Sequence, residues 1–240
     1  MDLNFKGKNI VITGGSTGIG ATMVKTFLEE GANVYFCGRS QEKLDLALEN
    51  LKDFSNVFAK QLDVTKEADF KGWIAEIGAV DVFVPNVSAL SGSWEDSIEV
   101  DLLATVKNIE VVIPAMTNPN PAVTFIGSIS ATITDCTSAY ASIKAALTQY
   151  VYSLSKEHAG KIRFNTIAPG STLFPGGGWD GYRISAPTEF KAKEDAHPMG
   201  RLASPQEVAN AVVFISSTRA SYISGEVLHI DGGEIATARL

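Results

Sequence analysis

The chain has 240 residues, 45% of them hydrophobic, and its 27 acidic and 20 basic side chains give a formal charge of −7. This length allows one large domain or two small ones. The apolar fraction is too high for an intrinsically disordered chain. The acidic balance, with no cluster of Lys or Arg, argues against a nucleic-acid-binding protein, because a phosphate backbone requires a concentrated positive face.

The sequence predicts neither a membrane span nor a secretion signal. The longest apolar runs, such as 80–84 and 208–215, are far shorter than the roughly 20 residues that span a bilayer. The first residues lack the basic and apolar regions of a signal peptide. Cys37 and Cys136 have neither metal-ligand spacing nor a disulfide framework, which favours packed side chains in a reducing compartment. We therefore expect a cytoplasmic protein.

Short apolar runs alternate with longer amphipathic stretches along the whole chain. The apolar runs predict strands at 9–13, 33–37, 57–62, 80–84, 122–126, 162–168 and 227–230. The amphipathic stretches predict helices over 18–30, 41–52, 66–77, 94–116, 138–158 and 205–216. Strands that are apolar on both faces and separated by helices belong in a parallel sheet covered on both sides. We predict a single doubly wound α/β domain over residues 1–240.

A glycine-rich turn, TGGSTGIG at 13–20, lies where the first predicted strand passes into the first predicted helix. Glycines there let the backbone approach a pyrophosphate, whose charge meets free N–H groups and the positive end of the helix. The alternative is a tight turn that needs glycine for packing. No Lys-Ser/Thr pair follows, so the turn is not a P-loop. The residues predicted to contact the cofactor here are Gly14, Ser16, Thr17, Gly18, Ile19 and Gly20.

The end of the second strand indicates which nucleotide binds. A carboxylate there accepts a hydrogen bond from the ribose 2′-hydroxyl of NAD, whereas a 2′-phosphate needs a cation. Arg39 and Ser40 follow this strand without an acid, which favours NADP(H) over NAD(H). The alternative for Arg39 is a solvated loop side chain. Asp63 and Val64, after the third strand, are predicted to hold the adenine, although helix capping by Asp63 or Thr65 explains them nearly as well.

Tyr140 and Lys144 lie four residues apart in a predicted helix, so an ammonium lies beside a phenol. A tyrosine with a pKa near 10 is a poor acid or base at neutral pH, and an adjacent cation lowers that value. Ser128, at the end of the fifth strand, provides a hydroxyl for a substrate carbonyl oxygen. Ser130 is the alternate serine or a supporting donor.

These motifs resemble those of the short-chain dehydrogenase/reductases of about 250 residues. The match covers nearly the whole chain: TGxxxGIG at 13–20, YxxxK at Tyr140 and Lys144, and NxxxPG at 165–170. The resemblance implies a Rossmann-type sheet, a nicotinamide cofactor, Tyr140 as proton donor or acceptor, Ser128 as carbonyl anchor and Lys144 as ribose ligand. It also implies cofactor contacts from Asn86, Pro169, Gly170 and Thr172, and a homotetramer or homodimer built on the helices 94–116 and 138–158.

Three positions depart from the family pattern. The family's NNAG is PNVS at 85–88, where only Asn86 is kept. The asparagine usual in the fourth helix is Asp101 here, and we include it in the predicted catalytic set. If this position mainly offers its backbone carbonyl to a water that leads to the lysine, aspartate serves; if the side-chain amide is required, the proton relay is weakened. The spacing from Ser128 to the tyrosine is one residue shorter than the commoner thirteen.

The segment 170–200 breaks the alternation of strands and helices. It is rich in glycine and proline, and a connection of this length predicts a lid over the substrate. Its aromatic residues Trp179, Tyr182 and Phe190 either close over an apolar ligand or pack the lid onto the body. The histidines 158, 197 and 229 show no metal spacing, and we predict no metal site.

The leading hypothesis is an NADP(H)-dependent oxidoreductase that interconverts a ketone or aldehyde and an alcohol, with a small, apolar or cyclic substrate and no membrane or nucleic-acid partner. The alternative is a catalytically silent NADP(H)-binding sensor or assembly protein, suggested by Asp101 and the 85–88 segment. An enoyl-thioester reductase is disfavoured, because those relatives space the Tyr and Lys further apart.

Overall fold

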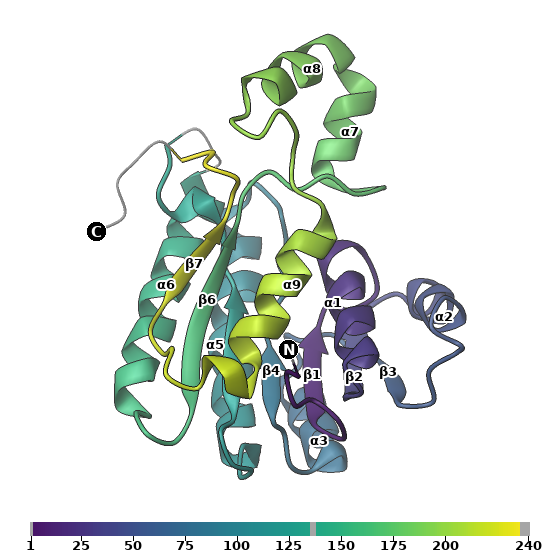
Figure 1. Cartoon of the computed structure of the whole chain (residues 1–240), viewed down its shortest axis with the longest axis vertical. Helices are drawn as coiled ribbons and strands as arrows, with labels where there is room; N and C mark the ends of the chain where they lie inside the picture. Colours follow the sequence, from purple (N-terminus) through teal and green to yellow (C-terminus); the bar gives the residue numbers. More distant parts are fainter. Residues whose placement is uncertain (1, 135–137, 236–240) are drawn as a thin grey trace.

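A computed structural model describes residues 2–134 and 138–235. Its centre is a seven-stranded, fully parallel sheet in the order β3-β2-β1-β4-β5-β6-β7 (Figure 1). The strands are β1 (Asn9–Thr13), β2 (Asn33–Gly38), β3 (Val57–Gln61), β4 (Val82–Val84), β5 (Ala122–Ile126), β6 (Arg163–Pro169) and β7 (Val227–Ile230). Every predicted strand is present, so the predicted fold class is confirmed.

Helices cover both faces of the sheet. On one face lie α1 (Gly18–Glu29), α2 (Gln41–Glu49) and α9 (Pro205–Ser216); on the other lie α3 (Glu67–Ile77), α5 (Ala104–Val112) and α6 (Ser138–Glu157). Alternate residues of β1 enter the two cores: Ile10 and Ile12 pack with the first group of helices, and Val11 with the second. The strand is therefore apolar on both faces, as its unbroken hydrophobic run predicts. Among the described residues, no helix is both long and apolar enough to cross a membrane.

The strand order reverses direction beside β1, whose neighbours are β2 and β4. In open parallel sheets the connections diverge at this point and leave a crevice outside the carboxyl ends of the strands, where ligands bind. The glycine-rich turn after β1 and the segment after β4 both open onto this crevice. The topology therefore places the predicted cofactor residues at the position where a dinucleotide is expected.

The predicted helix 94–116 is interrupted. It consists of α4 (Trp94–Asp96), the π-helix η1 (Ser97–Leu103), α5 and the 3-10 turn η2 (Ile113–Ala115). The hydrophobic period alone cannot distinguish a π-helical turn from the α-helix around it. Such wide turns are frequent at functional sites, and this one carries Asp101.

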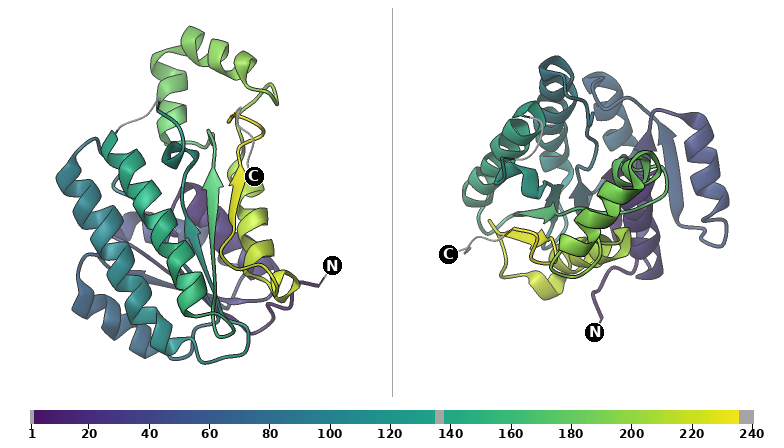
Figure 2. Two further views of the ribbon diagram at one scale, coloured as in Figure 1. Left: turned by 90° about the vertical axis from the view of Figure 1, so that its left-hand side faces the viewer. Right: turned by 90° about the horizontal axis from the view of Figure 1, so that it is seen from above.

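Residues 170–200, called here the crossover segment, contain two helices that the sequence analysis did not predict: α7 (Gly178–Ser185) and α8 (Pro187–Ala196). Pro187 lies at the first turn of α8, where its missing N–H costs nothing, so it begins a helix and does not break one. Both helices stand beyond the end of the sheet (Figures 1 and 2). A bridge between Thr172 and Ala203 joins the two stems of the segment at its base.

A buried arginine fastens α9 to the sheet. Arg163, at the start of β6, donates from Nη1 to the carbonyls of Ile215 (2.8 Å) and Ile223 (3.2 Å), and from Nη2 to those of Ser216 (3.0 Å) and Ser217 (3.1 Å). These carbonyls include those at the end of α9, where a cation is favourable.

We predict that Arg163→Ala lowers the free energy of unfolding by about 3 kcal/mol, because it leaves several buried carbonyls without their hydrogen-bond donor. Urea unfolding followed by circular dichroism measures the loss. Arg219→Ala removes an exposed arginine bound to the Asp2 carbonyl and serves as the control. A loss no larger than that of the control would contradict the account.

Candidate active site

The turn between β1 and α1 is built around three glycines. Gly14 and Gly18 have φ values of +69° and +56°, in the left-handed region that favours glycine. A Cβ on Gly20 would overlap the Gly14 carbonyl oxygen. The Thr17 N-cap makes no side-chain capping bond within the described chain, and the first turn of α1 has no acidic residue. The positive end of α1 is therefore available to an anion, with Gly18, Ile19 and Gly20 supplying its first N–H groups.

Asn86 holds this turn in place. Its Nδ2 donates to the carbonyls of Thr13 (3.2 Å) and Gly14 (3.1 Å), and its backbone N–H donates to the Thr13 hydroxyl (3.0 Å). The departures at 85–88 thus leave the link between β4 and the turn intact. Contact of Asn86 with the cofactor stays a prediction.

Phe174 packs against the same turn from a distant part of the chain, and the sequence did not predict this contact. A Cβ on Gly18 would lie 2.6 Å from the nearest atom of the Phe174 ring, and a Cβ on Gly177 would lie 2.8 Å from it. The ring therefore packs directly against both glycines. It joins the glycine-rich turn to the residue that precedes α7. No local pattern in the sequence connects positions 18 and 174.

The end of β2 meets the glycine-rich turn. A Cβ on Gly38 would lie 3.2 Å from the Ser16 hydroxyl, so Ser16 and the residues after β2 form one corner of the site. Arg39 is exposed there, and Ser40 caps α2 by accepting the Lys43 N–H at 3.3 Å. This corner therefore presents the solvent-exposed guanidinium of Arg39, and the residues that follow β2 there supply no carboxylate.

Asp63 and Val64 serve local structure. Asp63 Oδ1 accepts the N–H of Thr65 at 3.0 Å and its hydroxyl at 2.9 Å, so it stabilises a turn. The alternative of helix capping by Asp63 or Thr65 is wrong, because α3 has Lys66 as its N-cap and no side-chain capping bond among the described residues. The pKa of Asp63 is lowered, chiefly by the Thr65 N–H and with a smaller contribution from the charge of Arg39. Val64 is buried, and its carbonyl accepts from Asn108 Nδ2 at 3.2 Å. Their contact with adenine stays a prediction.

Lys144 brings the predicted catalytic residues together. It is 3% exposed, and its Nζ donates to the Ile126 carbonyl at 2.9 Å, two residues before Ser128. The same Nζ lies 5.6 Å from the ring centroid of Tyr140. Burial lowers the pKa of Lys144 to about 8, and the negative charge of Asp101 opposes this shift. Tyr140 is half-buried in the first turn of α6.

Ser128 follows β5 in an extended conformation and begins the short helix η3 (Ile129–Ala131). Its hydroxyl accepts the N–H of Ser130 at 3.1 Å, which orients the oxygen lone pairs and leaves the hydroxyl proton to donate elsewhere. Ser130 therefore supports Ser128 through its backbone.

Asp101 anchors the loop after β4. Its Oδ1 accepts the Ala89 N–H at 2.7 Å, while Oδ2 is buried with no hydrogen-bond partner among the described residues. The Asp101 side chain is 1% exposed, and its negative charge interacts with the ammonium of Lys144. An aspartate at this position thus adds a buried negative charge that favours the protonated ammonium.

The strand β6 ends at Pro169, and Gly170 and Thr172 continue the chain beside the crevice. The Thr172 hydroxyl donates to the Gly170 carbonyl at 3.0 Å, which tightens this turn. The intervening Ser171 is held by Glu234, a contact that sequence reasoning missed because 63 residues separate the two positions.

The aromatic residues of the crossover segment pack against one another. Trp179 and Tyr182 meet edge to face with centroids 6.0 Å apart, and Tyr182 and Phe190 likewise at 6.4 Å. Lys193 Nζ lies 4.8 Å from the Trp179 ring centroid. These rings form a small core between α7 and α8, whereas the packing alternative placed them between the lid and the body.

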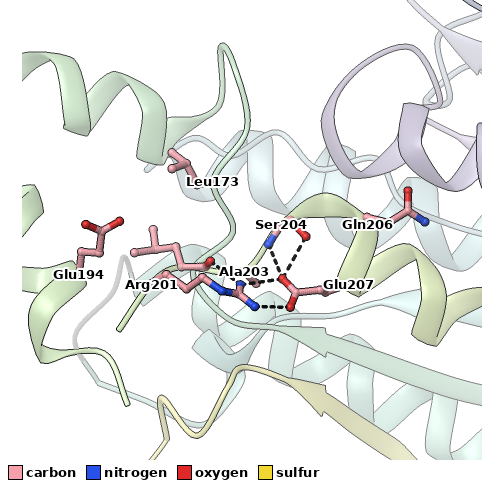
Figure 3. Close-up of a pocket in the computed structure, with 8 residues that line it drawn as sticks. Leu173, Glu194, Arg201, Ala203, Ser204, Gln206 and Glu207 are labelled. Atoms are coloured by element: carbon pink, nitrogen blue, oxygen red, sulfur yellow. Dashed lines mark hydrogen bonds and ion pairs between the residues drawn. The ribbon is translucent and has the colours of Figure 1, made fainter. Parts of the chain in front are cut away.

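A hollow of about 580 Å³ lies between the crossover segment and the start of α9 (Figure 3). An ion pair between Arg201 and Glu207, with Nη2 and Oε1 2.7 Å apart, crosses it, and Glu207 also accepts from the Ser204 N–H and hydroxyl. Its lining contains none of Ser128, Tyr140 and Lys144. We therefore do not regard it as the reaction site.

In the part of the chain that the structure describes, the other candidate metal ligands do not form a second centre. No group of three or more His, Cys, Asp or Glu side chains within residues 2–134 and 138–235 is arranged to hold a metal ion. Burial raises the pKa of the Cys37 thiol to about 12, so it is unreactive. Cys136 lies outside the described residues.

Comparison with known proteins identifies the arrangement. A family model described as enoyl-(acyl carrier protein) reductase matches residues 14–234. The chain belongs to the short-chain dehydrogenase/reductase family. Members of this family are NAD(P)-dependent oxidoreductases, and this protein is one that acts on the CH–OH/C=O couple.

Three similar members of the short-chain dehydrogenase/reductase family illustrate the match. The isoepoxydon dehydrogenase patN of Penicillium expansum is 31% identical over 95% of each chain. The 3-oxoacyl-[acyl-carrier-protein] reductase FabG of Salmonella typhimurium is 32% identical over 96% of this chain and 98% of its own. The L-sorbose reductase of Gluconobacter frateurii, complexed with NADPH and L-sorbose, superposes with a TM-score of 0.90 at 29% identity and covers 99% of this chain and 100% of its own.

The burial of Lys144 predicts a pH dependence of stability. An unfolded lysine keeps its proton up to about pH 10.5, whereas the folded site releases it near pH 8. Below pH 8 the folded state bears the cost of the buried charge, and this cost disappears between pH 8 and 10.5. Relative to Lys144→Met, the wild type should therefore gain about 3 kcal/mol of unfolding free energy across this interval.

Urea unfolding of both proteins at pH 7 and pH 10 measures this gain. Lys156→Met, which removes an exposed lysine of the same helix, should show a constant difference from wild type. An equally constant difference for Lys144→Met would contradict the prediction.

Proposed function

We propose that the protein is an NADP(H)-dependent oxidoreductase that interconverts a ketone or aldehyde and an alcohol. The observation that carries this proposal is the buried Lys144 ammonium, hydrogen-bonded to the end of β5 and 5.6 Å from the Tyr140 ring centroid. A cation in this position stabilises a phenolate and suits the phenol to proton exchange near neutral pH.

Each residue then has a defined task. Tyr140 gives a proton to the substrate oxygen or takes one from it, while the Ser128 hydroxyl holds that oxygen as charge develops on it. Lys144 lowers the pKa of Tyr140 and binds the nicotinamide ribose. Asp101 keeps Lys144 protonated. When bound, the nicotinamide supplies or accepts the hydride.

The chain's own residues fit a dinucleotide. Gly14 and Gly15 donate their N–H groups to the Cys37 carbonyl, which shapes the turn, and the N–H groups of Gly18, Ile19 and Gly20 at the start of α1 are offered to the pyrophosphate. The turn at Pro169, Gly170 and Thr172 is assigned to the nicotinamide half. The corner formed by Ser16, Arg39 and Ser40 offers a guanidinium to a 2′-phosphate, which favours NADP(H) over NAD(H). The NADPH complex of the similar L-sorbose reductase supports the same choice.

The substrate is a small molecule with an alcohol or a carbonyl group. The similar proteins are named for an isoepoxydon, a 3-oxoacyl thioester and a sugar, so they have the reacting group in common and little else. Although the matching family model carries an enoyl reductase name, the four-residue spacing of Tyr140 and Lys144 favours the carbonyl reaction. The aromatic residues of the crossover segment pack on one another. The proposal of an apolar or cyclic substrate therefore depends on this segment closing over the ligand as a lid.

We further propose that residues 1–240 form one domain, in which 170–200 is a lid over the substrate, and that the protein is a homotetramer or homodimer. Exposed apolar side chains on the two long helical stretches support the oligomer: Trp94 is 47% exposed, Ile98 41%, Leu103 48% and Tyr152 55%. Light scattering coupled to size-exclusion chromatography gives the mass directly.

The second candidate is a silent NADP(H) sensor or assembly protein, motivated by Asp101 and the 85–88 segment. The contacts of Asp101 with Ala89 and of Asn86 with Thr13 show that both departures retain local structural roles. A panel of ketones and alcohols separates the two candidates: turnover of any member supports the enzyme, whereas NADPH binding with no turnover supports the sensor.

Tyr140→Phe should lower the turnover rate by roughly 10²- to 10⁴-fold, the contribution of a positioned acid/base, while the NADPH dissociation constant stays largely unchanged. Steady-state rates and cofactor fluorescence measure the two quantities. Tyr152→Phe alters an exposed tyrosine of the same helix and should retain the wild-type rate. A near wild-type rate in Tyr140→Phe would refute the assigned role.

Arg39→Ala should weaken NADPH binding by roughly 10- to 100-fold, the loss expected for a charge-assisted hydrogen bond, and leave NADH binding unchanged. Fluorescence titration with each cofactor tests this, with Arg219→Ala as the control. Equal effects on both cofactors would show that Arg39 does not read the 2′-phosphate.

A further inference from the structure

Glu234, in the turn after β7, binds the chain segment that follows β6 through hydrogen bonds. Its Oε2 accepts the Ser171 N–H at 2.8 Å, and its Oε1 accepts the Ser171 hydroxyl at 2.6 Å. Each oxygen of the carboxylate thus accepts a hydrogen bond from the same residue, 63 positions away in the sequence. This bidentate arrangement fixes the position and the orientation of Ser171 together.

The turn is shaped to receive this carboxylate. A Cβ on Gly170 would lie 2.7 Å from Glu234 Oε2 and 2.8 Å from the Asp231 Cα, so only glycine permits the approach. Ser171 lies between Gly170 and Thr172, two of the three residues assigned to the nicotinamide half of the cofactor. The carboxylate therefore acts on the backbone that would carry those contacts.

The same carboxylate faces the crossover segment. Lys193 Nζ lies 3.6 Å from Oε1, and His197 Nε2 lies 3.7 Å from Oε2. His197 Nδ1 accepts the Met199 N–H at 3.2 Å, so in the neutral imidazole the proton is assigned to Nε2, toward Glu234. Met199 and His197 in turn pack on Gly232, where a Cβ would lie 2.7 and 3.0 Å from them. The C-terminal turn and the end of α8 thus meet around Glu234.

We propose that Glu234 is a positioning residue, which holds the 170–172 turn ready for the cofactor and latches the crossover segment over the site. This inference rests on the proposed function. Glu234 belongs to neither hydrophobic core, and its bonds join the turn, the crossover segment and the C-terminal turn. Its loss should therefore affect ligand binding and the order of the crossover segment more than global stability.

The test compares Glu234→Ala and Glu234→Gln with Glu226→Ala and Glu226→Gln, which alter an exposed glutamate just before β7. Glu234→Ala should raise the NADPH dissociation constant and the substrate KM by about tenfold, with kcat changed less than threefold. Tryptic cleavage after Arg183, Lys191 or Lys193 should be faster by a similar factor. Glu234→Gln keeps one acceptor for Ser171 but loses the charge that faces Lys193, so its effects should be intermediate.

Two outcomes would overturn the proposal. One is a Glu234→Ala protein that matches Glu226→Ala in dissociation constant, KM and cleavage rate. The other is a fall in Tm and kcat with KM unchanged, which would make Glu234 a purely structural residue. Cleavage and NADPH binding do not depend on turnover, so an absence of turnover in the wild type would refute the proposed function while leaving this test in force.

Discussion

The site depends on one buried interaction, the hydrogen bond from the Lys144 ammonium to the Ile126 carbonyl. It ties the first turns of α6 to the end of β5, and so determines how the Tyr140 ring lies relative to the segment that begins at Ser128. The cost of burying a charge is visible in the lowered pKa of Lys144, and Asp101 offsets part of it. An ordinary surface lysine could not order the site in this way, because solvent would screen both the hydrogen bond and the field on the phenol.

Much of this arrangement could be predicted from local sequence. A run such as residues 9–13 is apolar at every position because both faces of β1 are buried, and the alternation of such runs with amphipathic stretches fixes a parallel sheet. Order along the chain then brings the glycine-rich turn and the residues after β2 to the same corner. The Tyr140 and Lys144 spacing needs only helical geometry, so it too was accessible from the sequence.

What escaped prediction depends on contacts distant in sequence or on small differences in helix geometry. Phe174 on Gly18 and Glu234 on Ser171 join positions that no local pattern relates. The π-helical turn at Asp101 spans only Ser97–Leu103, too short a stretch to show a hydrophobic period of its own within the surrounding helix. The helices α7 and α8 were hidden by glycines and prolines typical of loops, although Pro187 begins a helix. Their aromatic residues, considered for a ligand, are used to pack the pair.

The central claim is that the buried Lys144 ammonium lowers the pKa of the Tyr140 phenol. Ultraviolet titration of Tyr140 tests it most directly. The tyrosinate signal of Tyr140 is isolated by subtracting the titration of Tyr140→Phe from that of the wild type. The same subtraction is repeated in the Lys144→Met background. The account predicts a lower Tyr140 pKa when Lys144 is present than when methionine replaces it. Identical titration curves in the two backgrounds would contradict it.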